Sequence, residues 1–212
     1  MKKKLIALML AGFCATPTLV QAAPTPYASA SIGLGFAKNA DVSLGSNTII
    51  GAINYKTAGP FAGGPLVGAL GLKGDNYRIE AAVGYQKYSA DSISIPATTA
   101  ENANVSITTY MANAYFDDEL NESRFIPYII GGLGVATINP TGTNFEASAE
   151  SVFAWQVGGG IGVKATNNLV VDLGYRYLSP SASTVTVASP SYGTGKLTFG
   201  MSNILLGMRY NF

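Results

Sequence analysis

The chain has 212 residues, of which 12% are charged and 48% are apolar, whereas charged residues make up about 25% of a typical soluble domain. The formal net charge is +1, which excludes the strongly basic surface of a nucleic-acid-binding protein. The sequence contains no histidine, which excludes the usual general base, the Ser-His-Asp triad and most transition-metal sites.

The first 22 residues have the three parts of a secretory signal peptide. Residues 2–4 are lysines, and an apolar stretch over residues 5–15 follows them. That stretch is shorter than the roughly 20 residues that a membrane-spanning helix needs, so a permanent anchor is disfavoured. The Val-Gln-Ala sequence at 20–22 fits signal-peptidase recognition. We therefore expect cleavage after Ala22 and a mature domain of residues 23–212.

The only cysteine, Cys14, lies inside this segment. Phe13 precedes it where a lipoprotein signal requires a small residue, so lipidation is disfavoured. Cleavage would leave a mature chain without thiol chemistry. It would also remove three lysines and no acids, leaving 10 Lys and Arg against 12 Asp and Glu, a net charge of −2. These features predict an exported protein that does not bind nucleic acid.

The remaining sequence divides into eight strand-like stretches, mostly of roughly 9 to 14 residues, which is long enough for tilted membrane strands. Apolar residues recur at every second position, and β-branched and aromatic residues dominate, as in β-strands. No mature segment has 18 uninterrupted apolar residues, so we expect no transmembrane helix. The predicted strands are residues 27–36, 61–72, 77–89, 105–116, 125–137, 151–164, 169–178 and 196–212.

Short and long connections alternate between these stretches. This alternation is typical of an outer-membrane barrel with short periplasmic turns and longer extracellular loops. An even strand count places both chain ends on the turn side. Residues 48–57 are themselves strand-like, and we expect them to extend the barrel wall outward. The short connections are residues 73–76, 117–124 and 165–168, and the long ones are about 37–60, 90–104, 138–150 and 179–195.

Charged residues in the stretches fall on one of the two faces. Along residues 169–178, Leu173 and Tyr175 alternate with Asp172 and Arg176. An Arg or Lys facing lipid at mid-membrane costs about 2–4 kcal/mol. We therefore expect the apolar face to contact lipid and the polar face to line a lumen. The predicted fold class is all-β, an eight-stranded antiparallel up-and-down transmembrane β-barrel.

The lumen of such a barrel is only wide enough for its own side chains, so opposite charges inside it should pair. We expect a polar network that plugs the barrel and holds its strands together, with an ion path as the alternative. Its charged members are predicted to be Arg78, Glu80, Asp172, Arg176 and Arg209, with Asn113, Gln156, Gln86 and Asn203 completing the hydrogen bonds.

Aromatic residues are expected to gather at the two membrane edges. Those near the turns or the C-terminus are Tyr77, Phe116, Phe125, Tyr210 and Phe212, and those nearer the long loops are Tyr85, Tyr110, Phe153 and Trp155.

Two further clusters are interpreted as structural. The acidic residues Asp117, Asp118, Glu119 and Glu122 are expected to form a solvated periplasmic turn, with calcium binding as the alternative. The glycine-rich run at 158–162 lacks the Lys-Ser/Thr of a phosphate loop and is expected to face a crowded lumen. We predict no catalytic, cofactor-binding or metal-binding residues.

Four segments carry a family resemblance: YASASIG at 27–33, MANAYFD at 111–117, PYIIGGLG at 127–134 and MRYNF at 208–212. The sequence resembles the small outer-membrane β-barrels of Gram-negative bacteria, which include the OmpA transmembrane domain, OmpX-like proteins and the opacity surface antigens. The resemblance implies export through the periplasm to the outer membrane. It also implies that Tyr210 and Phe212 form a signal for the barrel-assembly machinery.

We therefore expect a monomeric, non-enzymatic barrel that contacts outer-membrane lipid and lipopolysaccharide. It would have a structural role, a surface-interaction role through loops that meet a host or cell-surface ligand, or both. A narrow porin-like channel is the first alternative. A soluble lipocalin-like binder is the second, and it would need an apolar interior and a polar exterior, the reverse of the predicted charge placement.

Overall fold

The computed structural model describes residues 23–37, 40–44, 48–55, 57–59, 63–94, 104–118, 123–142, 145–146, 149–181, 183–186, 194–198 and 200–212. The expected signal peptide, with Cys14 in it, lies outside these residues, as do Glu119 and Glu122. In the part of the chain that is described, no helix has the length and apolar character to cross a bilayer.

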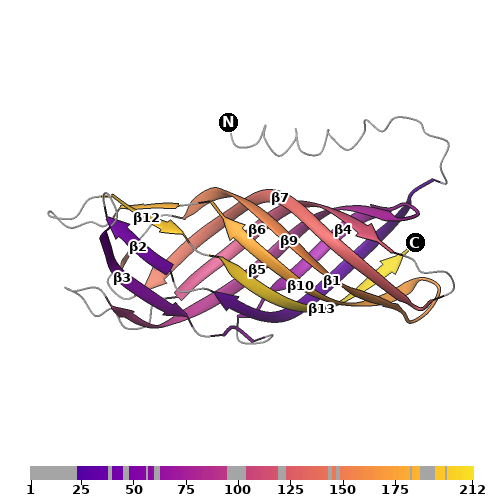
Figure 1. The fold of residues 1–212 in the computed structure, drawn as a ribbon, viewed down its shortest axis with the longest axis horizontal. Coiled ribbons are helices and arrows are strands. Elements are labelled where there is room, and N and C mark those ends of the chain that lie inside the picture. The colour runs from indigo at the N-terminus through magenta and orange to yellow at the C-terminus, as the bar shows by residue number, and fades with distance from the viewer. Residues whose placement is uncertain are drawn as a thin grey trace.

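Eight strands form a closed antiparallel barrel (Figure 1). β1 pairs with β4 on one side and with β13 on the other, and β5 pairs with β6, so every barrel strand has two neighbours. Closure satisfies the backbone hydrogen bonds within the wall, as a hydrocarbon environment requires. The predicted fold class is confirmed. Around the barrel the strands are β1 (Thr25–Ala37), β4 (Leu66–Lys73), β5 (Tyr77–Ser94), β6 (Asn104–Asp117), β7 (Phe125–Gly142), β9 (Glu150–Lys164), β10 (Leu169–Pro180) and β13 (Met201–Asn211).

Four predicted strands differ clearly from the observed ones. Two run further than the predicted stretches 77–89 and 125–137, because β5 ends at Ser94 and β7 ends at Gly142, so the expected loops 90–104 and 138–150 begin within strands. The other two begin later than expected. The stretch 61–72 enters the barrel only at Leu66, because Gly63 has a φ of 94°, which a strand does not allow. The stretch 196–212 is divided between two strands, β12 (Thr194–Thr198) and β13. β12 pairs outside the barrel with β2 (Ala40–Leu44) and β11 (Ser183–Thr186), so the chain changes partners between Thr198 and Met201.

The loop end of the barrel continues as further β-structure. β3 (Thr48–Tyr55) pairs with residues 90–94 of β5 and with β2, and β2 pairs with β12. The short β8 (Phe145–Glu146) pairs with the end of β7. Figure 1 shows β2, β3 and β12 at the end of the barrel opposite the C-terminus. The prediction that residues 48–57 extend the wall is confirmed by β3.

The other end of the barrel carries the short connections and both ends of the barrel domain. The backbone N–H of Phe212 donates to the carbonyl oxygen of Pro26 at 3.0 Å. The turn from β4 to β5 contains only residues 74–76, and the turn from β9 to β10 contains only residues 165–168. The expected placement of both chain ends beside the short turns is confirmed.

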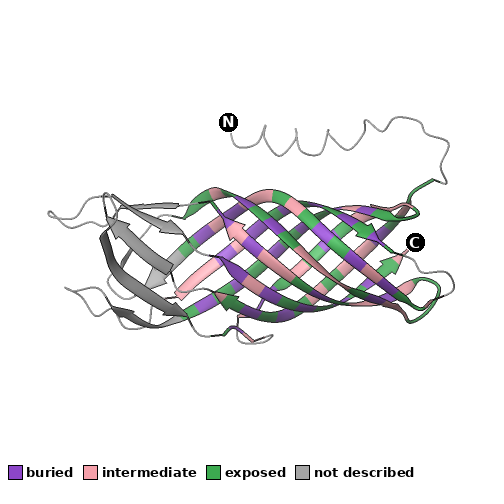
Figure 2. Ribbon diagram, viewed as in Figure 1, coloured by how far each residue is buried: buried purple, intermediate pink, exposed green. Residues whose placement is uncertain are grey.

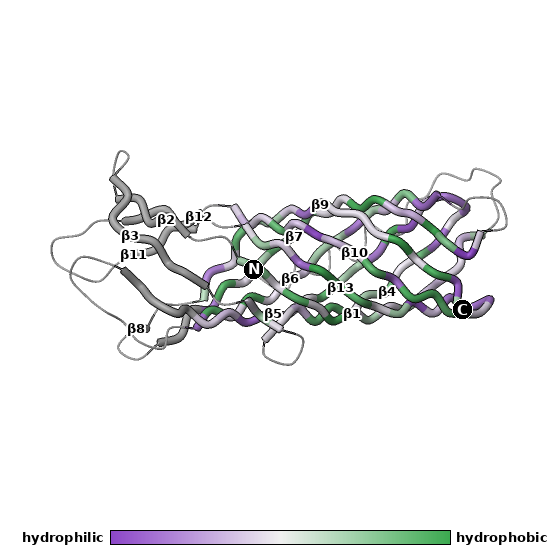
Figure 3. The backbone as a smooth tube through the Cα atoms, turned by 60° about the horizontal axis from the view of Figure 1, so that its bottom comes forward, coloured by the Kyte–Doolittle hydropathy of each residue, from purple (hydrophilic) through white to green (hydrophobic). Residues whose placement is uncertain are grey.

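Exposed and buried residues alternate along every barrel strand (Figure 2). The outward positions hold large apolar side chains, such as Leu70 at 67% exposed and Ile129 at 66%. A soluble protein would not leave so much contiguous apolar surface in water. Figure 3 shows apolar segments repeating along the strands around the barrel. The expected apolar exterior and polar interior are confirmed, and the soluble lipocalin-like alternative is wrong.

Candidate functional site: the closed lumen

The lumen is filled by two layers of side chains. The layer near the short turns is polar and charged, and its side chains come from β1, β5, β6, β7, β9, β10 and β13. The layer near the long loops is mostly apolar. Each layer is built from positions two residues apart, because only alternate residues of a strand point inward.

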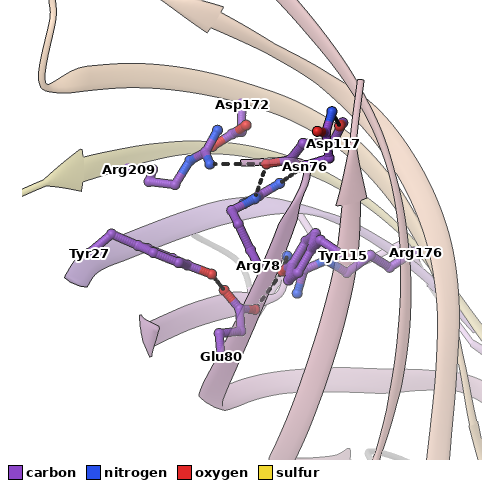
Figure 4. Close-up of polar contacts among 9 residues, drawn as sticks. All are labelled: Tyr27, Asn76, Arg78, Glu80, Tyr115, Asp117, Asp172, Arg176 and Arg209. Carbon is purple, nitrogen blue, oxygen red and sulfur yellow. Dashed lines mark hydrogen bonds and ion pairs between the residues drawn. The ribbon is translucent and has the colours of Figure 1, made fainter. Parts of the chain in front are cut away.

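Asp117 is the centre of the polar layer. The Arg78 guanidinium binds it in a bidentate manner, with Nε donating to Oδ2 at 2.7 Å and Nη2 donating to Oδ1 at 2.8 Å. Arg209 Nη1 lies 3.7 Å from Asp117 Oδ2, and its Nε lies 3.4 Å from Asp172 Oδ2. Figure 4 shows Arg78 and Arg209 converging on this group. The ion pairs join strands β5, β6, β10 and β13 across the lumen.

The Arg78 guanidinium also lies against aromatic rings. Its central carbon is 4.1 Å from the ring centroid of Tyr115, 5.1 Å from that of Tyr128 and 5.9 Å from that of Tyr27. Tyr115 and Tyr128 themselves pack edge to face at 5.8 Å. A guanidinium that stacks on rings within about 6 Å gains cation–π stabilisation, which is larger where water is excluded. The rings thus add to the attraction that Asp117 provides.

Glu80 forms a second centre, which depends on hydroxyl and amide donors. Its carboxylate accepts hydrogen bonds from Tyr27 Oη at 3.0 Å, Asn113 Nδ2 at 2.9 Å and Tyr115 Oη at 2.5 Å. Arg176 Nη2 in turn donates to Tyr115 Oη at 2.9 Å, so this hydroxyl bridges Arg176 and Glu80. Figure 4 places the Tyr115 ring between the two charged groups.

The polar layer leaves little free space. The cavity between its side chains has a volume of about 20 Å³. A water molecule needs about 10–15 Å³ of such space, so the cavity has room for about one water and not for a continuous water column. It is lined by Ser29, Ser31, Arg78, Glu80, Tyr115, Tyr128, Asp172, Arg176 and Leu205.

A second layer of buried side chains lies across the lumen on the loop side. Ile107 is 1% exposed and Met201 is 0% exposed, although both point into the barrel. Tyr88 and Leu178 pack with them, so side chains from β5, β6, β10 and β13 meet there. Gln86 lies in the same region, where Nε2 donates to Met201 Sδ at 2.9 Å. An apolar constriction of this kind excludes water and ions.

Two glycines make room for the Tyr128 ring. A Cβ added at Gly174 would lie 2.5 Å from Tyr128 Oη, and one added at Gly160 would lie 2.6 Å from the same atom. Gly160 belongs to the glycine run of β9, and Gly174 lies opposite it on β10. These lumen-facing glycines let the ring cross toward β10, as the crowded-lumen interpretation of the run requires.

The structure places the predicted lumen residues on inward positions, but it does not join all of them. Gln156 Nε2 donates to Asn113 Oδ1 at 2.5 Å and so connects to Glu80. Gln86 belongs to the loop-side layer, and Asn203 Oδ1 has no hydrogen-bond partner among the described residues. The predicted residues are Arg78, Glu80, Gln86, Asn113, Gln156, Asp172, Arg176, Asn203 and Arg209.

One prediction about this region is wrong. Asp117 was expected in a solvated turn, but it is the last residue of β6, has 0% exposure and pairs with Arg78. Asp118 is exposed, as expected. The physical reason is strand alternation: Met111, Asn113 and Tyr115 point inward, so Asp117 does too. Because both carboxylate oxygens of Asp117 pair with arginines, Asp117 is not a ligand in the calcium site that was the alternative for this cluster.

Sequence reasoning also missed three tyrosines of the network, Tyr27, Tyr115 and Tyr128. The expected network contained only charged and amide side chains and no tyrosine hydroxyl. The alternation of the strands was the available signal. Tyr115 is two residues from the inward Asn113, so it also points inward, and Tyr27 is paired with Gly71 and faces the lumen with it.

Tyr210 and Phe212, the predicted assembly signal, are 49% and 68% exposed on the outer wall. Their ring centroids lie 5.4 Å apart.

A family model described as the outer membrane protein beta-barrel domain matches residues 5–212. The chain belongs to this family of outer-membrane β-barrels. Its location is therefore the Gram-negative outer membrane, with the barrel spanning the bilayer.

One relative is the outer membrane protein PagN of Salmonella typhimurium. It is 31% identical over 126 residues, which are 51% of this chain. The match also spans 51% of PagN, about half of its length.

Solved structures share the fold of this outer-membrane barrel at low identity. OprG of Pseudomonas aeruginosa matches with a TM-score of 0.60 and 10% identity, over 90% of this chain and 98% of that one. The outer membrane protease OmpT of Escherichia coli matches with a TM-score of 0.53 and 12% identity, over 93% of this chain and 100% of that one. Because both identities are low, these likenesses show the fold alone.

Proposed function

We propose that this chain is a monomeric, non-enzymatic outer-membrane barrel with a closed lumen, whose function lies in its outer wall and its loops. The observation that carries the proposal is the filling of the lumen by two layers, with a cavity of about 20 Å³ in the polar layer. A pore for solutes would need a continuous aqueous path. The long loops and the sheet of β2, β3, β11 and β12 then provide the surface that meets other cells or a host.

The non-enzymatic role is supported by the residues of the chain itself. The sequence contains no histidine, the most common general base. The strongly buried charged groups Arg78 and Asp117 bind each other and are not presented to a substrate. Because OmpT is a protease with the same fold, the fold alone does not exclude an enzyme. The non-enzymatic part of the proposal therefore rests on the composition of the chain and on the paired charges.

Planar-bilayer recording of the refolded protein tests the closed lumen. We expect no steady open state, because neither layer leaves a path for ions. A reproducible unitary conductance would contradict the closed lumen and would favour the narrow channel. Heat-modifiable gel migration of the same sample establishes that the barrel is folded.

A loop variant tests the surface role. Residues 181–200 can be replaced by a short turn between β10 and β13, which leaves all eight barrel strands in place. We expect a non-adherent Gram-negative strain that displays the full chain to bind cultured epithelial cells, and the loop variant to lose that binding. Binding by the strain with the full chain that is no greater than binding by the same strain without the chain would remove the surface-interaction role and leave a structural one.

We also propose that residues 1–22 are removed during export, so that the mature protein begins at Ala23. N-terminal sequencing of protein extracted from outer membranes tests this. Retention of Met1 would contradict it.

We further propose that the barrel-assembly machinery recognises Tyr210 and Phe212 before insertion. Exchange of both residues for alanine would then lower the amount of barrel in the membrane.

A further inference from the structure

Lys87 is a charged residue on the outer wall of the barrel. It continues the outward face of β5, on which Val83 is 51% exposed and Tyr85 is 46% exposed, and it is itself exposed. The other charged residues of the barrel strands whose side chains the structure describes occupy lumen-facing positions. They are Lys73, Arg78, Glu80, Asp117, Glu150, Lys164, Asp172, Arg176 and Arg209.

The height of Lys87 places it at the boundary of the hydrocarbon. Tyr77, on the same face, marks the turn-side edge of the apolar band. Ten residues of strand span about 33 Å, and a tilt of about 40° reduces this to a height of about 25 Å. The apolar band of an outer-membrane barrel is also about 25 Å tall. The Lys87 ammonium therefore lies among lipid headgroups on the loop side rather than among acyl chains.

The outer wall changes from apolar to polar at this height. Val83 pairs across the strands with Tyr110, whereas the next outward pairs are Tyr85 with Thr108 and Lys87 with Ser106. Tyr85 Oη donates to Ser106 Oγ at 3.5 Å. Hydroxyl groups thus lie beside the lysine, directly above exposed apolar side chains.

The position of Lys87 is fixed by its backbone. Its N–H donates to the carbonyl oxygen of Gly63 at 2.7 Å. A Cβ added at Gly63 would lie 2.6 Å from the carbonyl oxygen of Lys87, so the two backbones pack closely. Within the described residues, no carboxylate lies within ion-pair distance of the Lys87 ammonium. The backbone of Lys87 is thus held in the wall, and its ammonium is available for an anion from outside the chain.

We propose that Lys87, together with the hydroxyls of Tyr85 and Ser106, binds a phosphate group of lipid A in the outer leaflet. An ammonium beside hydroxyl donors fits a phosphate monoester, and the acyl chains of the same lipid lie against Val83 and Tyr110 below. The loop end of the barrel faces the leaflet that contains lipid A. The site lies on the outer wall, so it does not depend on whether the lumen is closed.

Binding of lipid A to the refolded barrel in detergent tests the site. Wild type and Lys87→Gln are titrated, in the presence of EDTA, with bis-phosphorylated lipid A and with enzymatically dephosphorylated lipid A. We expect Lys87→Gln to bind the phosphorylated lipid roughly fivefold more weakly, since one lysine near an anionic lipid surface contributes about a fivefold preference. Both proteins should bind the dephosphorylated lipid equally, and Lys87→Arg should retain wild-type binding.

Arg124→Gln is the matched control, because it removes one exposed positive charge at the opposite, turn-side end of the barrel. It should bind phosphorylated lipid A as wild type does. The proposal is overturned if Lys87→Gln binds phosphorylated lipid A like wild type, or if Arg124→Gln weakens binding as much. Competition by millimolar inorganic phosphate would also overturn it, because the site would then bind free phosphate. Heat-modifiable migration of each variant excludes misfolding, and conductance of the wild type tests the closed lumen separately.

Discussion

At the scale of single residues, the lumen depends on the pairing of groups that are costly to bury alone. Asp117 has 0% exposure and Arg78 has 3%, and each satisfies the other through two hydrogen bonds. Removing one partner of such a buried pair leaves an uncompensated charge, which is more costly than removing both. Arg209 depends on Asp117 as well, since its only other ion-pair contact among the described residues is Asp172.

Asp117→Asn should therefore destabilise the barrel by about 3–5 kcal/mol. Urea unfolding of the protein refolded in lipid vesicles measures this loss. Asp118→Asn is the control, because the neighbouring Asp118 is exposed, and it should change the free energy of unfolding by less than about 0.5 kcal/mol. Similar effects of the two substitutions would contradict the assignment of Asp117 to the network.

At the scale of strands, glycines on β9 and β10 determine how closely the Tyr128 ring can approach the wall. A Cβ at Gly174 meets Tyr128 Oη at 2.5 Å, but its next neighbours lie at an ordinary 3.6 Å. A Cβ at Gly160 meets the backbone carbonyl of Leu173 as well as the tyrosine hydroxyl. The first clash involves only a hydroxyl, whereas the second also involves backbone that cannot move aside.

Gly174→Ala should destabilise the barrel by about 1–3 kcal/mol through overpacking, and Tyr128→Phe should remove most of that cost in the double variant. The same tyrosine substitution should not rescue Gly160→Ala, because the carbonyl clash remains. Unfolding free energies of the single and double variants measure both couplings. Gly131→Ala, whose added Cβ meets nothing within 4 Å, is the neutral control. Equal rescue at both glycines would refute this explanation.

At the scale of the whole molecule, we expect the two layers to close the lumen independently. The polar layer holds Arg78 and Asp117, and the apolar layer holds Ile107 and Met201 on the loop side. We expect either layer to block a water column, because an apolar constriction excludes ions and the tightly packed polar layer has a cavity of only about 20 Å³ between its side chains. Closure of the strands adds the further condition that the wall has no free edge.

The double variant Arg78→Ser with Asp117→Ser should therefore give no steady conductance in planar bilayers, since the apolar layer remains. Conductance is expected only when Ile107→Ala and Met201→Ala are added to it. The conductance of wild type, the double variant and the fourfold variant is recorded in planar bilayers. Heat-modifiable migration shows that each of the three barrels is folded. A steady current through Arg78→Ser with Asp117→Ser alone would show that the polar layer is the only seal.

The sequence by itself determined the strand number, the alternation of lipid-facing and lumen-facing residues and the side on which the long loops lie. These features follow from the local periodicity of apolar residues and from the high free-energy cost of a charge in hydrocarbon. Both the periodicity and the positions of the charges are visible in the sequence. The partners of the charges were decided only by the tertiary structure. Asp117 meets Arg78 because the register of β5 and β6 and the tilt of the strands bring them together, and Glu80 meets Tyr27 across two strand boundaries. Such contacts depend on the distances between side chains across the lumen of the closed barrel. These distances cannot be derived from the spacing of residues along one strand.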